Sequence, residues 1–303
     1  MASLKEIKGR IASVKSTLKI TSAMKMVASA KLHKAQNAIT NMLPYEQKLR
    51  EMLQLLLSSG KTSCQAGPLP LSSPRESLLS DAAAFGSCAK VAVVAFSSNS
   101  SLCGGFNANV IREVKARIAE IESAGESVEV IGVGRKVAES LRKAGYPSAA
   151  DWSNLVAHTS YAEAQSLAGM LQEGFDSGVY SRVELIYNHF VSTATQKVTR
   201  DIYLPMTLEA APGAKPERVD DDIIIEPSPE GMIEQLLPRV RSLRIYAVAL
   251  DSVAAEHAAR TVAMQTATDN GENILQELTL EYNKGRQQKI TSEILDIVGG
   301  SMQ

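Results

Sequence analysis

Two very long stretches of helical periodicity, one towards each end of the chain, constrain the fold more than any other feature. Apolar residues recur three and four positions apart from about residue 4 to 57, and again from about 229 to 298. At 1.5 Å per residue these helices would extend roughly 80 and 105 Å, whereas helices of globular domains average about 11–12 residues. Either helix alone would expose its apolar stripe, so we predict that the two pack together as an antiparallel coiled coil.

Prolines and glycines interrupt both predicted helices. Pro44 is expected to kink the first helix, and Pro238 to kink or restart the second, because proline removes a backbone donor and crowds the preceding turn. Gly271 and Gly285 each cost a helix interior about 1 kcal/mol relative to alanine. A helix that tolerates them must be held by packing along its length.

The middle of the chain has the pattern of an α/β domain. The β-branched run at 90–98 is typical of a buried parallel strand. Helices and strands then alternate, which predicts a parallel sheet, followed by an antiparallel strand pair at 182–191 and 197–204. The fold class is therefore α/β with long helices, a coiled coil plus a central Rossmann-like domain. The expected segments are an N-terminal coiled-coil helix (1–58), a connector (59–88) with a short helix at 76–85, the α/β domain (89–206), an acidic connector and foot (207–228) with a strand at 223–226, and a C-terminal coiled-coil helix (229–303).

Composition excludes several classes of protein. The 303 residues are 45% hydrophobic and 21% charged, with a net charge of −1, which is ordinary for one or two soluble domains. No run of 18 apolar residues is present to cross a membrane. The spacing of Cys64, Cys88 and Cys103 fits no zinc or CxxC pattern, which indicates a reducing compartment and no metal. The charged start lacks the apolar region of a signal peptide.

The near-neutral total hides two oppositely charged segments. Residues 1–34 carry eight Lys or Arg against one acid, giving +7, and residues 201–234 carry nine acids against two bases, giving −7. Such segregation predicts different partners for the two regions, although a solvated face is the simpler explanation. The basic helix lacks the aromatics and the module of a nucleic-acid binder. Its narrow heptad stripe favours a partner helix over a membrane surface, and we favour an acidic protein partner.

Two motifs of the middle domain have both a ligand-binding and a structural explanation. The sequence GVG at 132–134 follows a strand, as in dinucleotide-binding loops, but Val137 stands where the third glycine belongs and no suitable acid follows. Cys103 lies in the serine-rich stretch 97–107, where open sheets bind ligands, but no His–Asp pair accompanies it. We interpret both as tight turns between a strand and a helix.

The final residues of the second helix form an amphipathic tip. Ile290, Ile294, Ile297 and Val298 share one face, with polar residues opposite. A frayed terminus would explain this pattern. An apolar tip that extends past its partner helix, however, predicts another protein around it.

Three separated stretches resemble the gamma subunit of F-type ATP synthases, and they occur in that family's order. They are LKEIKGRIASVKSTLKITSAMKMVASAKLHKAQ at 4–36, SSLCGGFN at 100–107 and ARTVAMQTATDNGENILQELTLEYNKGRQQKITSEILDIVGG at 259–300. The resemblance implies a central stalk that transmits torque between a membrane ring and a catalytic hexamer, coupling proton flow to ATP synthesis or hydrolysis without chemistry of its own. Its implied partners are the alpha and beta subunits of the hexamer, the epsilon subunit and the ring of c subunits.

The resemblance also implies roles for individual residues. Arg286 and Gln287 match a catch contact with a beta-subunit loop, and Met24 with Lys25 matches the opposing N-terminal site. The basic helix is expected to follow acidic lever segments of the beta subunits. The residues expected to contact the hexamer are Arg286, Gln287, Arg260, Thr291, Glu293, Met24, Lys25, Lys19 and Lys15. The residues expected to contact the membrane ring are Asp222, Glu226 and Pro227.

No catalytic residue, cofactor or metal is expected, and neither nucleic-acid binding nor membrane insertion. The start at Met1 favours a bacterial member over a mitochondrial one, which predicts peripheral attachment to the cytoplasmic face of the plasma membrane. The regulatory dithiol insertion of chloroplast members is missing from the sequence. Two alternatives remain: an α/β ligand-binding or enzymatic domain with coiled-coil interaction arms, and a structural coiled-coil adaptor. Co-purification with ATP-hydrolysing subunits would distinguish the stalk from both.

Overall fold

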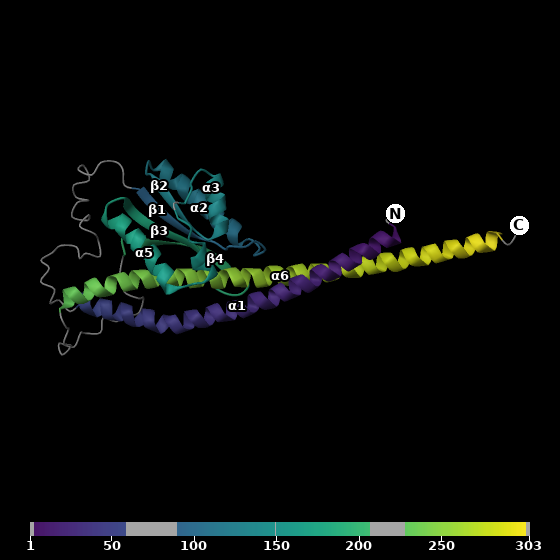
Figure 1. The fold of residues 1–303 in the computed structure, drawn as a ribbon, viewed down its shortest axis with the longest axis horizontal. Helices are drawn as coiled ribbons and strands as arrows, with labels where there is room; N and C mark the ends of the chain where they lie inside the picture. The colour runs from purple at the N-terminus through teal and green to yellow at the C-terminus, as the bar shows by residue number, and fades with distance from the viewer. Residues whose placement is uncertain (1–2, 59–89, 149, 207–227, 301–303) are drawn as a thin grey trace. The chain divides into compact units, whose positions relative to one another are not determined.

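The computed structural model describes residues 3–58, 90–148, 150–206 and 228–300 (Figure 1). The helix predicted at 76–85 and the strand predicted at 223–226 lie outside these residues. The described elements are α1 (Leu4–Ser58), β1 (Lys90–Phe96), α2 (Phe106–Ser123), β2 (Val128–Val133), α3 (Arg135–Lys143), α4 (Ser153–Ala157), α5 (Tyr161–Asp176), β3 (Tyr180–Phe190), β4 (Gln196–Leu204) and α6 (Pro229–Gly300).

The two terminal helices form as the periodicity predicts. α1 has 55 residues and continues past Pro44, and α6 has 72 residues and continues past Pro238. The restart considered at Pro238 does not occur. Pro238 is exposed, and its carbonyl oxygen accepts a hydrogen bond from the Ser242 hydroxyl at 2.8 Å. The proline ring therefore points to solvent rather than into the packed face of the helix.

The described residues fall into two compact units. One unit lies within residues 1–30 and 260–303, and contains the N-terminal half of α1 with the C-terminal part of α6. The other lies within 31–259 and contains the whole sheet, α2 to α5, and the remaining parts of α1 and α6. We call them the coil unit and the sheet unit.

The sheet of the sheet unit has the order β2-β1-β3-β4. β1 pairs in parallel with β2 and with β3, and β3 pairs antiparallel with β4. This confirms the predicted parallel sheet followed by an antiparallel strand pair. The short helix α4 was not predicted from the sequence, because five residues are too few to show a helical period.

Both faces of β1 are covered, which explains its unbroken apolar run. Its odd-numbered residues from 91 to 95 pack against α2 and α3. Its even-numbered residues from 92 to 96 face α4, α5 and the middle of α6. Figure 1 shows α2 and α3 on the side of the sheet away from α6. Helices therefore cover both faces of the sheet, and the middle of α6 lies among those on one face.

On its other side, α6 packs against the C-terminal half of α1 within the sheet unit. Leucines of both helices form this seam near the start of α6, and alanines such as Ala254 and Ala258 continue it against Leu32 and Ala35. Small side chains let the two helices approach closely. Residues 240–259 of α6 are consequently mostly buried, with α1 on one side and the sheet on the other.

Candidate functional site

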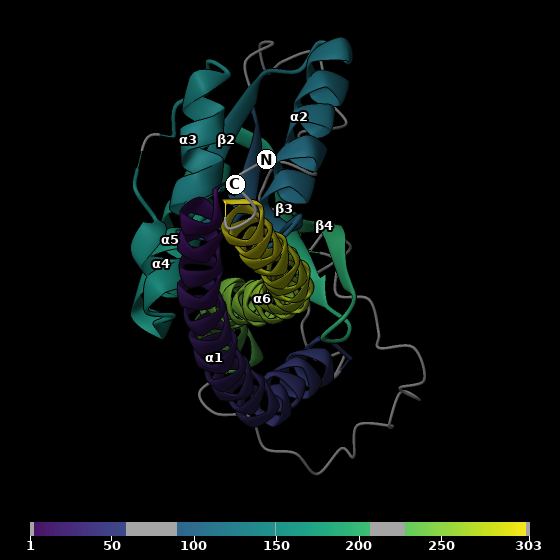
Figure 2. The same ribbon diagram turned by 90° about the vertical axis from the view of Figure 1, so that its right-hand side faces the viewer.

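The coil unit pairs its two helices in antiparallel register (Figures 1 and 2). Four cross-helix neighbours fix this register: Leu4 with Gly285, Leu18 with Gly271, Thr21 with Thr268, and Lys25 with Gln265. The two residue numbers of each pair add to 289 or 290, as an antiparallel pairing requires. The heptad pattern predicted the pairing, and the structure adds its register.

Gly271 has a packing reason that the sequence did not reveal. A Cβ atom at this position would lie 2.7 Å from Cδ2 of Leu18 and 3.2 Å from its Cγ. The glycine therefore makes room for a leucine of the facing helix. Gly285 does the same more loosely, since its Cβ would lie 3.2 Å from Cδ2 of Leu4. Close packing at both positions offsets the cost of glycine in a helix interior.

The basic side chains of the first helix divide into two kinds. Lys25 is half-buried, and its Nζ donates a hydrogen bond to Oε1 of Gln265 at 2.5 Å, which ties it to the facing helix. Lys15 and Lys19 are exposed, and within the described part of the chain neither has an acidic partner within 4.0 Å. Met24 is half-buried beside them. Lys15 and Lys19 thus keep their charge available to another molecule.

The residues expected to form the catch, Arg286 and Gln287, lie elsewhere on the coil unit and are exposed on α6. Thr291 and Glu293, two further expected contact residues, are exposed on the same helix. The Thr291 hydroxyl donates to the carbonyl oxygen of Gln287 at 2.9 Å, and Glu293 lies 3.7 Å from Lys289.

The catch residues and the Met24–Lys25 pair lie on separate surfaces of the coil unit. Gln265 faces Lys25, and Arg286 lies 21 residues after Gln265 on α6, which is roughly 32 Å of helix. Arg260 differs from the other expected contact residues because it is only 9% exposed within this chain. The residues expected at the membrane ring, Asp222, Glu226 and Pro227, lie outside the described residues.

Within the described residues, the tip of α6 exposes large aliphatic side chains. Ile290, Ile294, Leu295 and Val298 are about half or more exposed, and Ile297 is 72% exposed. These residues follow Gly285, the last α6 position paired above with α1. A cluster of exposed large aliphatic side chains on one helix end is typical of a surface that another protein covers.

The glycine-rich turn after β2 leaves no anion-binding site at the start of α3. Its first backbone N–H groups are already bonded: that of Arg135 to Asn99 Oδ1 at 3.0 Å, that of Lys136 to the carbonyl of Ser98 at 3.2 Å, and that of Val137 to Ser97 Oγ at 3.0 Å. A phosphate would need these donors. The prediction of a tight turn is confirmed.

Cys103 is also structural. Its side chain is 2% exposed, and its Sγ accepts a hydrogen bond from the Asn107 amide at 3.1 Å. Cys103 and Phe106 pack against Ala255 and Ala259 of α6. The serine-rich loop therefore fastens the start of α2 to α6.

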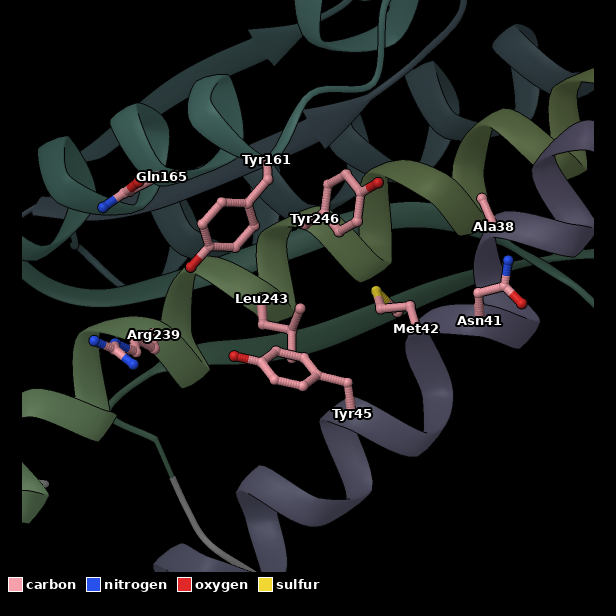
Figure 3. A pocket seen from close by; sticks show the side chains of 9 residues that line it. All are labelled: Ala38, Asn41, Met42, Tyr45, Tyr161, Gln165, Arg239, Leu243 and Tyr246. Atoms are coloured by element: carbon pink, nitrogen blue, oxygen red, sulfur yellow. The ribbon is translucent and has the colours of Figure 1, made fainter.

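The sheet unit has an open groove of about 700 Å³ between α1, α5 and α6 (Figure 3). Its lining residues are Ala38, Asn41, Met42, Tyr45, Tyr161, Gln165, Arg239, Leu243 and Tyr246. The ring of Tyr161 meets that of Tyr246 edge to face, with centroids 6.0 Å apart. These groups can stack and donate hydrogen bonds, but none is arranged as a nucleophile with a base.

The described residues contain no group of three His, Cys, Asp or Glu side chains placed to hold a metal ion. None of their helices is long and apolar enough to cross a membrane.

The family model and the curated relatives that match this chain agree with one another. The family model described as ATP synthase matches residues 3–302. The chain is 50% identical over 303 residues to the ATP synthase gamma chain of Phocaeicola vulgatus, with all of both chains covered. It is 49% identical over 317 residues to that of Bacteroides thetaiotaomicron, again with full coverage. The gamma chain of Flavobacterium johnsoniae is 42% identical over 306 residues, covering 99% of this chain and 98% of the relative.

Solved structures show the same fold at low sequence identity. The rotor of the Euglena gracilis mitochondrial ATP synthase aligns with a TM-score of 0.60 and 18% identity, covering 95% of this chain and 98% of that one. A central-stalk chain of the Tetrahymena thermophila mitochondrial ATP synthase aligns with a TM-score of 0.52 and 20% identity, covering 82% of this chain and 99% of that one.

Proposed function

Because the chain belongs to the ATP synthase gamma-chain family, we propose that it is the central rotor shaft of that complex and that its two exposed helical surfaces contact the catalytic hexamer. It is a non-catalytic subunit and transmits torque between the membrane ring and the hexamer. Its partners are the alpha and beta subunits and the ring. We also propose that the complex is attached to the cytoplasmic face of the plasma membrane, because the full-length relatives are bacterial.

The observation that carries this function is the register of the coil unit. Cross-helix neighbours are spaced from Leu4–Gly285 to Lys25–Gln265, so the two helices are packed along about 21 residues. A single helix twists easily, whereas two helices that interlock along their length resist twisting together. The coil unit is built to carry torque along its axis.

The apolar tip and the lysines suit two kinds of sliding contact. The aliphatic residues from Ile290 to Val298 need an apolar sleeve, but a smooth one, since they carry few polar groups that would lock one orientation. Lys15 and Lys19 can attract successive acidic segments as the shaft turns, because exposed charges interact without interlocking. Arg286 and Gln287 lie along the coil unit between the lysines and the apolar tip. A hydrogen-bonding catch there would hold the rotor at one rotational angle.

Charge reversal tests the lysine contact. Lys15→Glu with Lys19→Glu replaces two attractions to an acidic surface with two repulsions, at about 0.2–1 kcal/mol per exposed pair. A total near 1–2 kcal/mol slows rotation about 5- to 30-fold. Lys25 is reversed separately, since Lys25→Glu also removes the bond to Gln265. The measurement is the rotation rate and torque of single complexes under ATP.

The matched control is Lys115→Glu, an exposed lysine on α2 in the sheet unit. It changes the net charge in the same direction away from the proposed contact, so rotation should stay at the level of the unsubstituted complex. Equal rotation rates and torque in the Lys15–Lys19 double variant and in this control would show that the lysines do not take part.

A further inference from the structure

α6 is tied to the sheet by charged side chains in an otherwise apolar contact. Asp251 uses both carboxylate oxygens: Oδ2 lies 2.6 Å from Nδ1 of His189, and Oδ1 accepts the backbone N–H of Phe190 at 2.9 Å. The Asp251 side chain is 18% exposed, so this carboxylate is largely removed from water. It grips the end of β3 through one side chain and one backbone group.

A second tie engages β4. Oδ2 of Asp201 accepts a hydrogen bond from Nη2 of Arg244 at 2.8 Å and another from the Tyr187 hydroxyl at 2.9 Å. Asp201 is the register partner of Leu185 on β3. The carboxylate therefore joins α6 to both strands of the β3–β4 hairpin.

The spacing of the two ties matches on helix and hairpin. Arg244 and Asp251 are seven residues apart, which is two turns of α6, or about 10 Å on one helix face. On β3, His189 follows Leu185 by four residues, or about 13 Å along the strand. α6 thus runs beside β3 in the same direction, with a polar tie at each end of the contact.

Between the ties the contact is apolar. Ile245 and Val248 of α6 are fully or almost fully buried in the cluster that contains Leu185 and Tyr187. Apolar packing alone is non-directional and opposes separation more than sliding. One polar tie would still act as a pivot, whereas two ties two turns apart also oppose rotation of the hairpin about the contact.

We propose that Asp251 and Asp201 are torsional positioning residues, which make the β3–β4 hairpin and the middle of α6 turn as one rigid body. This inference rests on the proposed rotor function. In the sequence, residues 205–228 connect β4 to α6. A torque applied to this connecting segment is therefore transmitted to both β4 and α6. The two ties divide that load between the sheet and the shaft helix.

Torsional stiffness tests this inference in the assembled complex. The hexamer is immobilised, and a probe is attached to Lys115→Cys, an exposed position on α2, in a background where Cys64 and Cys88 are serine. The angular variance of the probe during catalytic pauses reports the compliance between the sheet unit and the shaft. Because a single remaining tie acts as a pivot, losing either tie should raise the angular variance of the probe.

Asp251→Ala and Asp201→Ala should each raise the variance, and the double variant should raise it further. Asp251→Asn keeps an oxygen for the Phe190 N–H and should restore part of the stiffness. The control is Asp269→Ala, an exposed aspartate of α6 whose side chain bonds only to Gln265 of the same helix. A merely structural role would lower assembly without changing the variance of assembled complexes.

Unchanged variance in the two alanine variants, relative to Asp269→Ala, would overturn the inference. Should Asp251→Ala fail to assemble, Arg244→Gln tests the second tie instead, because the Arg244 side chain is about one-third exposed and tolerates replacement more readily. Failure of the proposed rotor function would look different: the probe on the unsubstituted complex would not rotate at all.

Discussion

A disulfide between Thr21 and Thr268 would lock the two helices of the coil unit together. The hydroxyl of Thr268 lies 3.0 Å from that of Thr21 across the coil. An S–S bond of about 2.0 Å requires these positions to approach by only about 1 Å after replacement by cysteine. The double variant Thr21→Cys with Thr268→Cys should therefore cross-link under mild oxidation.

The cross-link should stabilise the chain strongly. Its ends are 247 residues apart, and closing a loop of that size removes chain entropy worth about 5.5 kcal/mol from the unfolded state. Strain at the 1 Å approach reduces this figure, so we expect about 3–4 kcal/mol. At about 2–4 °C per kcal/mol for a chain of this size class, the melting temperature of the full chain should rise by roughly 10 °C.

Function should be unaffected, because both helices belong to the same rotating body. ATP hydrolysis and rotation of the complex are measured before oxidation, after oxidation and after reduction, with each single-cysteine variant as a control. Cross-linking without loss of rotation is the expected result. Two results would refute the reasoning: no cross-link, which would contradict the register, or a loss of hydrolysis reversed by reduction, which would mean that the helices must separate.

Two predictions concern the sheet unit. Glu184 is 3% exposed, and burial alone would raise its pKa. The hydrogen bonds from Arg117 at 2.7 and 2.8 Å, together with the positive charges of Arg117, Arg182 and Arg200, outweigh burial and lower the pKa. The ionised carboxylate therefore stabilises the fold above pH 4.5, and this contribution is lost as the pH falls through the lowered pKa. Glu184→Gln should lower the free energy of unfolding by about 3 kcal/mol at neutral pH. Measured by urea unfolding, the stability of the variant should fall less steeply as the pH is lowered than that of the unsubstituted chain. Within α5, a Cβ atom added at Gly169 would have no atom within 4 Å. Gly169→Ala should therefore raise the free energy of unfolding by about 1 kcal/mol. Gly174→Ala would place a Cβ 2.3 Å from the ring of Tyr180 and should lose about 1–3 kcal/mol in the same assay.

The sequence predicts elements well where a period or a turn marks them. The run at 90–98 becomes β1, and the two terminal periodic stretches become α1 and α6, each close to the expected bounds. α4 escapes because five residues show no period. The N–H of its first residue bonds to the Asp151 carboxylate at 2.9 Å, which is a local signal that a capping search could detect.

Long-range polar contacts could not be predicted in the same way. Asp251 and His189 are 62 residues apart, and Arg244 and Asp201 are 43 apart. Only the packing of α6 on the hairpin brings each pair together. Gly271 illustrates the same limit: composition assigns it a cost, and only the register of the coil reveals that Leu18 fills the space.

The roles of the expected contact residues also depend on geometry that the sequence does not contain. Lys15, Lys19 and Lys25 look alike in the sequence, yet Lys25 is engaged with Gln265 and the other two are free to meet a partner. The catch at Arg286 and Gln287 stays a prediction, since its partner belongs to another chain.

Rotation of this chain inside the hexamer tests the central claim most directly. A probe on Lys115→Cys, with the hexamer fixed to a surface, should turn stepwise in one direction when ATP is supplied and stop when hydrolysis is inhibited. Continued ATP hydrolysis with the probe stationary relative to the hexamer would contradict the account, because a shaft that carries torque must turn with each catalytic cycle.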